Sequence, residues 1–179
     1  MLTILLLIPF LGALLISVLP SSDNPERTRD LTLVTLALQC VLSFALLIPF
    51  NAAEPDMQLL ETLPWLPQVG LEFSLALDGL SLPLVLMNGV LCLVAAAASR
   101  SIDNRPRLYF ALLLVISGAV NGAFLAQNLL LFFIFYELEL IPLWLLIAVW
   151  GGANRAYAST KFLIVTAVSG VLILAAFLG

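Results

Sequence analysis

The hydrophobic positions of this chain form long continuous runs, and most polar positions are confined to short stretches between them. Six runs approach the roughly 20 residues that a helix needs to cross about 30 Å of hydrocarbon. The expected spans are Leu2–Leu19, Leu31–Phe50, Gly79–Ala98, Leu108–Ala126, Leu129–Trp150 and Thr160–Leu178. The pattern predicts an all-α membrane protein with six transmembrane helices. Because no basic residues precede the first run, we expect it to be a retained helix and not a signal peptide.

The longest polar stretch, residues 51–78, is rich in proline and acidic side chains. Alternation of apolar and polar residues over Leu71–Leu77 predicts a short strand or hairpin there. Asp78 is placed to cap the helix that follows, and Trp65 to anchor the loop at the membrane interface.

The basic residues all fall in or beside the first, third and fifth connections between the runs. They are Arg27, Arg29, Arg100, Arg105, Arg107, Arg155 and Lys161. Short loops with Lys and Arg remain on the cytoplasmic side. We therefore expect these loops to face the cytoplasm or its equivalent, and residues 51–78 to face the opposite compartment.

Composition excludes several kinds of chemistry. Hydrophobic residues make up 63% of the chain and charged residues 10%, and there is no histidine. Cys40 and Cys92 stand alone in apolar runs, so an iron–sulfur or zinc site is not expected, and no glycine-rich phosphate-binding loop is present. Redox chemistry would have to lie on another chain, and we expect no metal, no catalytic residue and no nucleic-acid partner here.

Two carboxylates interrupt the fifth run, in the stretch FFIFYELELIP. Glu137 lies about 12 Å into the predicted helix, near mid-membrane, where a charge costs at least ~2.5–3.5 kcal/mol. It is either a neutral, hydrogen-bonded packing group or a site that binds a proton or cation. Glu139 is rotated from it by about 200° and so lies on nearly the opposite face. Pro142 removes a backbone hydrogen bond and should loosen or break the helix beside both acids, but this reasoning does not choose between them.

Other polar side chains could support such a site. Ser117 and Asn121 are one turn apart beside a GxxxG pattern, which indicates either close helix packing or contacts to a water chain. Lys161 is either an interfacial anchor or a cation that tunes the neighbouring acid. Thr166 could contribute a hydroxyl to a water chain.

Four motifs resemble the antiporter-like membrane subunits of respiratory complex I and their photosynthetic relatives. They are ETLPWLP (Glu61–Pro67), LDGLSLPLVL (Leu77–Leu86), FYELELIPLWLLIAVWGG (Phe135–Gly152) and STKFLIVTAVSG (Ser159–Gly170). The motifs occur in the family's order, and the resemblance covers nearly the whole chain.

The resemblance implies a proton-translocating subunit of about fourteen helices with two inverted repeats that form half-channels. The family's essential glutamate lies five residues before a proline, which Glu137 and Pro142 match, whereas Glu139 is outside the common pattern. Lys161 matches a basic residue near the start of the family's sixth helix. Residues 1–106 would then form the first three helices, and residues 107–179 an incomplete first half-channel. The family's central lysine lies on a seventh helix that this chain does not reach, so we expect a longer protein.

The resemblance also implies partners. No redox cofactor would bind this chain. Plastoquinone, NAD(P)H or ferredoxin and the iron–sulfur clusters would bind partner subunits, and the neighbours would be other membrane subunits, including antiporter-like ones. The expected location is a cyanobacterial or chloroplast thylakoid, with the basic loops on the cytoplasmic or stromal side.

Two other functions stay open: a subunit of a multi-subunit sodium/proton antiporter, and a docking scaffold with a vestigial channel. Val165 in KFLIVT replaces a more usual aromatic residue and hints at a variant that serves carbon dioxide uptake.

Overall fold

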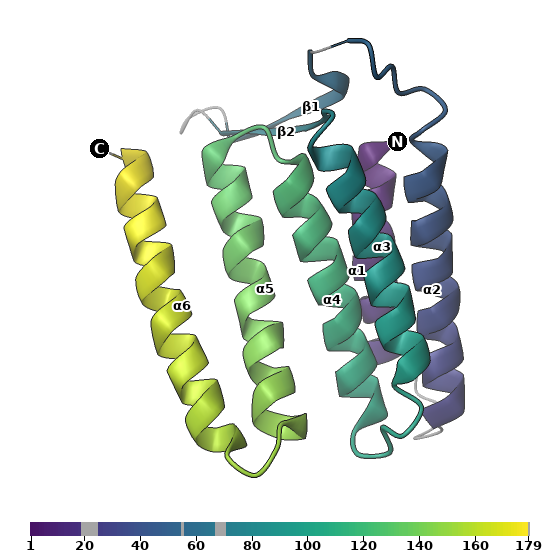
Figure 1. Ribbon diagram of the computed structural model, residues 1–179, viewed down its shortest axis with the longest axis vertical. Coiled ribbons are helices and arrows are strands. Elements are labelled where there is room, and N and C mark those ends of the chain that lie inside the picture. The colour runs from purple at the N-terminus through teal and green to yellow at the C-terminus, as the bar shows by residue number, and fades with distance from the viewer. Residues whose placement is uncertain (19–24, 55, 67–70, 179) are drawn as a thin grey trace.

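The computed structural model describes residues 1–18, 25–54, 56–66 and 71–178, and it consists of a helical bundle with one β-hairpin (Figure 1). The elements in chain order are α1 (Leu2–Val18), α2 (Pro25–Ala45), β1 (Gln58–Leu66), β2 (Leu71–Leu77), α3 (Ser81–Ala98), α4 (Pro106–Leu125), α5 (Leu129–Trp150) and α6 (Arg155–Leu178).

The helix bounds agree with the hydropathy pattern for α5 and differ most for α2. The α2 helix was predicted to lie at Leu31–Phe50, but it lies at Pro25–Ala45. Hydropathy finds only the apolar part of a helix, whereas α2 begins in a polar turn. Its first residue is proline, which lacks an N–H group, and the first N–H groups of a helix have no acceptor within the helix in any case. The α6 helix begins at Arg155 and not at the predicted Thr160, because its first residues, RAYAS, include polar side chains and so lie before the apolar run.

Five of the six helices are long and apolar enough to cross a membrane by length and composition within the described residues: α2, α3, α4, α5 and α6. The α1 helix has 17 residues. At 1.5 Å per residue it is about 26 Å long, slightly less than the roughly 30 Å of hydrocarbon. Leu19, the predicted end of the first span, lies outside the described residues.

The α4 helix occupies the centre of the bundle and packs against α1, α2, α3 and α5. The α6 helix forms one edge and packs against α5 (Figure 1). The apolar core has two parts: one includes Leu2, Leu75 and Leu125 near the hairpin, and the other includes Leu36 and Leu114. Almost all of α6 is exposed or half-buried, so most of its apolar surface has no cover within the described chain.

The predicted hairpin is present as an antiparallel pair of β1 and β2. Its second strand points Leu75 and Leu77 into the core beside Leu2 of α1. Because these apolar side chains are fully buried, the hairpin is part of the packed structure and closes one end of the bundle.

Glu61 of β1 fastens the hairpin to the start of α1. Its carboxylate accepts hydrogen bonds from the Met1 amino group, the Leu2 and Thr3 amides (both 2.9 Å) and the Thr3 hydroxyl (2.6 Å). Partial burial raises the pKa of Glu61, but the Met1 ammonium, the Thr3 hydroxyl and these amides outweigh that effect and lower the pKa from 4.5 to about 2. The carboxylate thus satisfies amides at a helix start that would otherwise lack partners.

Asp78, predicted to cap α3, lies two residues before Leu80, the residue at the N-cap position, but its carboxylate still accepts hydrogen bonds from amides at the start of the helix. Its Oδ1 accepts hydrogen bonds from the amides of Leu80 (3.1 Å) and Ser81 (2.6 Å). The hydrogen bonds from the backbone amide and the hydroxyl of Ser81 lower the pKa of Asp78.

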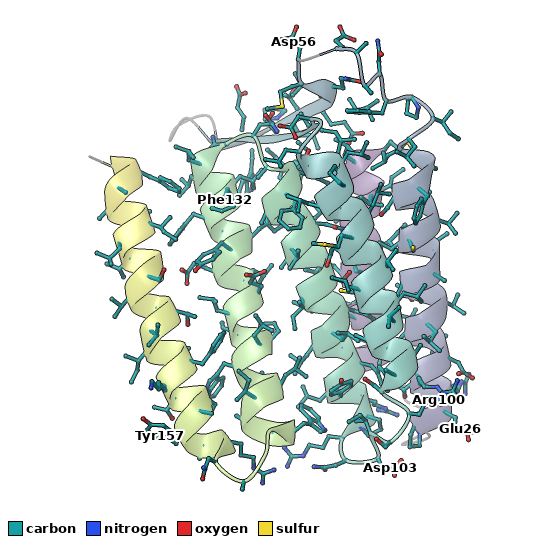
Figure 2. All side chains as sticks on the ribbon, viewed as in Figure 1. Glu26, Asp56, Arg100, Asp103, Phe132 and Tyr157 are labelled. Atoms are coloured by element: carbon teal, nitrogen blue, oxygen red, sulfur yellow. The ribbon has the colours of Figure 1, made fainter. Side chains whose placement is uncertain are left out.

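Charged side chains gather at the end of the bundle opposite the hairpin. Figure 2 labels Glu26, Arg100 and Asp103 at this end and Asp56 at the other. The connection between α5 and α6 lies at the same end as that between α3 and α4 (Figure 1). The basic residues of the three connections therefore share one side of the predicted membrane.

Candidate functional site

The Glu137 side chain lies between α5 and α6. It is half-buried, and its Oε1 is buried with no hydrogen-bond partner among the described residues. A Cβ atom added to Gly170 of α6 would overlap this oxygen. Glycine at position 170 therefore makes the space into which the carboxyl group projects.

The antiparallel packing of α5 and α6 explains why these two residues meet. Glu137 lies about 20 Å from the last residue of α5, and Gly170 about as far from the first residue of α6, at 1.5 Å per residue. Nearer the hairpin end, Phe132 of α5 contacts Phe177 of α6 in the same register, with ring centroids 6.5 Å apart. Figure 2 labels Phe132 at this end of α5. The short connection between α5 and α6 thus determines which residues of the two helices lie opposite each other.

Glu139 takes no part in this contact. It is half-buried, and at about 100° per residue it is rotated from Glu137 by about 200°. The described residues give it no hydrogen-bond or ion-pair partner. The α5 helix continues through the buried Pro142 as one helix, without the predicted break. The two carboxyl groups therefore occupy separate environments on an uninterrupted helix.

Lys161 and Thr166 lie on α6, and among the described residues neither forms a hydrogen bond or an ion pair with Glu137. The Lys161 side chain is exposed, with Nζ 5.9 Å from the centroid of the Tyr157 ring. It precedes Gly170 by about 13 Å along the helix. The Thr166 hydroxyl donates to the Phe162 carbonyl of its own helix at 2.7 Å. Any influence of the Lys161 ammonium on Glu137 must act through space.

Ser117 and Asn121 of α4 are fully buried but face α2 and α3. The Ser117 hydroxyl donates to Gln39 Oε1 at 3.0 Å, and Asn121 Oδ1 accepts from Asn88 Nδ2 at 2.8 Å. The structure brings neither side chain into hydrogen-bond contact with Glu137.

The glycines of the GxxxG pattern serve close packing. A Cβ at Gly118 would overlap the ring of Phe10 in α1, and one at Gly122 would overlap the ring of Phe135 in α5. Each glycine therefore admits an aromatic ring from a neighbouring helix, which is the packing use of small residues in membranes.

Sequence reasoning missed three residues that matter here: Gly170, Gln39 and Asn88. The two amides are single polar residues within apolar runs, which is a usable signal for a buried hydrogen-bonded group. Gly170 could have been found by pairing α5 and α6 antiparallel across their short connection. Within the described residues, no group of three or more His, Cys, Asp or Glu could hold a metal.

Comparison with known proteins agrees with this fold. The family model described as "NADH:quinone oxidoreductase/Mrp antiporter, TM" matches residues 126–179, which include Glu137 and Gly170. The chain is 44% identical over 179 residues to NAD(P)H-quinone oxidoreductase chain 4 2 of Thermosynechococcus vestitus, covering 99% of this chain and 33% of that protein. It is 42% identical to chain 4 1 of Synechococcus elongatus, covering 98% of this chain and 33% of that protein. The chain thus spans about a third of the length of these relatives.

Solved structures give the same result. A chain of respiratory complex I from Thermus thermophilus with bound NADH superposes with a TM-score of 0.83 at 28% identity, covering 99% of this chain and 35% of that one. A chain of the Mrp complex from Dietzia superposes with a TM-score of 0.78 at 24% identity, covering 98% of this chain and 19% of that one, which shows a shared fold. By sequence and fold, this chain belongs to the antiporter-like membrane subunits of the complex I type.

Proposed function

We propose that this chain is part of a proton-translocating subunit of an NAD(P)H- or ferredoxin–plastoquinone oxidoreductase, and that Glu137 carries the proton. One observation supports this most directly: a carboxyl group lies within a predicted membrane span, points at the bare backbone of Gly170, and has a buried oxygen without a partner in the described chain. An ionisable group in a transmembrane helix marks a functional site by default, because its insertion is costly.

The chemistry follows from the surroundings of the carboxyl group. In this proposal Glu137 binds and releases a proton, and water, a hydrogen-bond donor or a positive field stabilises its carboxylate form. A change at a distant quinone-reducing site that alters this stabilisation alters proton binding, since coupling between two sites is reciprocal. In this proposal Lys161 supplies part of the field through space, and Thr166 supplies a water contact on α6.

The remaining parts of the proposal concern partners and place. Electron donors, plastoquinone and iron–sulfur clusters would bind other subunits, and this chain would lie beside further antiporter-like subunits in a thylakoid membrane. Its basic end would face the cytoplasm. Ser117 and Asn121 would contact water in a cluster of their own.

The test uses the full-length protein in its complex. Glu137→Gln and Glu139→Gln keep the shape of the side chain and remove its titration. After assembly is confirmed, proton uptake and quinone reduction are measured together in sealed vesicles. We expect Glu137→Gln to abolish or sharply reduce proton uptake and Glu139→Gln to retain it. Normal uptake in both variants would contradict the proposal and favour a docking scaffold with a vestigial channel.

A second candidate is a subunit of a sodium/proton antiporter, because the matching family model describes both complex I and Mrp antiporter proteins. It predicts transport that depends on sodium and needs no quinone reduction. Measuring uptake with and without sodium, and with quinone reduction inhibited, separates the two candidates. Copurifying subunits would show whether the complex is a variant for carbon dioxide uptake.

A further inference from the structure

A second set of polar side chains lies inside the bundle, apart from Glu137. We call it the amide cluster, and it joins three helices: Gln39 of α2, Asn88 of α3, and Ser117 and Asn121 of α4. Gln39, Ser117 and Asn121 are 0% exposed, and Asn88 is 7% exposed. Polar groups buried this deeply need hydrogen-bond partners, since neither lipid nor bulk solvent can supply them.

Hydrogen bonds fix the direction of the asparagine amides. Asn88 Nδ2 lies 3.0 Å from the Ser117 carbonyl oxygen and 2.8 Å from Asn121 Oδ1. A backbone carbonyl can only accept, so the Asn88 nitrogen must face it. The Cys92 thiol, which lies 3.3 Å from Asn88 Oδ1, donates to that oxygen. Asn121 must therefore present its oxygen to Asn88, and its own nitrogen points elsewhere.

Two amide nitrogens remain without an acceptor among the described residues: Asn121 Nδ2 and Gln39 Nε2. Gln39 uses its oxygen to accept from the Ser117 hydroxyl. Turning the Gln39 amide over would only exchange an unpaired donor for an unpaired acceptor. The network as it stands is therefore incomplete on two sides, both within fully buried side chains.

The chemistry of the two unpaired amide nitrogens determines which kind of partner they can bind. Both present N–H groups, which repel a metal cation and require an acceptor. The cluster residues carry no formal charge that would hold an anion. Water accepts from N–H donors and can donate in turn to hydroxyl or carbonyl oxygens, and buried waters typically make about three such bonds. We propose that the amide cluster is an internal water site, in which ordered water accepts hydrogen bonds from Gln39 Nε2 and Asn121 Nδ2.

Such water would complete a polar connection between α2, α3 and α4. It would thereby fix the rotation of α4 about its own axis. That rotation keeps Gly118 and Gly122 facing the rings of Phe10 and Phe135. The site is distinct from the proposed proton carrier, because its hydrogen bonds run to α2 and α3, whereas Glu137 faces α6. The inference therefore stands whether or not Glu137 carries protons.

The experiment is a cryo-EM map of the complete complex at a resolution that shows ordered water. We expect density within hydrogen-bond distance of Gln39 Nε2 or Asn121 Nδ2. The density at Gln39 should be lost in Gln39→Leu, which removes the donor. It should be retained in Ser43→Ala, because the buried Ser43 hydroxyl donates to the Gln39 carbonyl of its own helix.

Three outcomes would overturn the proposal. They are an empty site in a map that resolves other buried waters, occupation of the site by a side chain from another segment or subunit, and density beside residue 39 that persists unchanged in Gln39→Leu. The wild-type map alone decides the first two, so the test does not depend on the folding of a variant.

Discussion

Replacing Gly170 by alanine would put a methyl group where the Glu137 carboxyl group now lies. The added Cβ would overlap Glu137 Oε1 and would lie 3.2 Å from the carboxyl carbon, so the carboxyl group has to rotate or α6 has to move. Inserting one carbon into a packed site typically costs about 1–3 kcal/mol. At about 1.36 kcal/mol per tenfold in rate, that cost reduces proton transfer through Glu137 by about 5-fold to 150-fold if it falls on this step.

The effect should not come from a weaker helix, because alanine is favoured over glycine in a helix by about 1 kcal/mol. The assay is proton uptake per quinone reduced in sealed vesicles that contain the assembled complex. Gly152→Ala is the matched control, since a Cβ at that position meets nothing within 4 Å. Shortening the acid should restore space, so Glu137→Asp with Gly170→Ala is expected to pump better than Gly170→Ala alone. Wild-type pumping by Gly170→Ala would refute the assigned contact.

Two further predictions concern the hairpin and α3. Glu61→Gln should loosen the hairpin from α1 and speed hydrogen exchange of the Thr3 amide, which bonds to this carboxylate. Because the folded-state pKa of Glu61 is lowered from 4.5 to about 2, the wild-type contribution is complete above about pH 4.5 and is lost as the pH falls through about 2. The protection factor of the Thr3 amide, which is its exchange rate corrected for the intrinsic rate at each pH, should fall over this range, and a protection factor that stays constant would contradict the prediction. Asp78→Ala should cost about 0.5–2 kcal/mol through loss of the cap at Ser81. Thermal melting of the purified protein measures this, with exposed Asp56→Ala as the control that should not change the melting temperature.

The positions of α3, α4 and α5 could be predicted because the hydrocarbon of a membrane imposes a length and an apolar composition on any helix that crosses it. The seven basic residues likewise predicted which connections lie together. Helix ends outside the hydrocarbon were predicted less well, as α2 and α6 show, because a polar turn can continue a helix without a hydropathy signal.

The sequence by itself determined that Glu137 and Glu139 lie on different sides of one helix, because the rotation per residue is fixed. It did not determine what either side chain faces. That choice depends on how α5 packs against α4 and α6, and only the tertiary structure placed Glu137 against Gly170.

The same distinction holds for α4. The sequence showed Ser117 and Asn121 on one face beside two glycines, and it left packing and water contacts as alternatives. In the structure the two glycines pack against aromatic rings of α1 and α5. Ser117 and Asn121 instead form hydrogen bonds with Gln39 and Asn88. Contacts between helices far apart in the chain depend on mutual fit and not on local pattern, which is why only the folded bundle decided them.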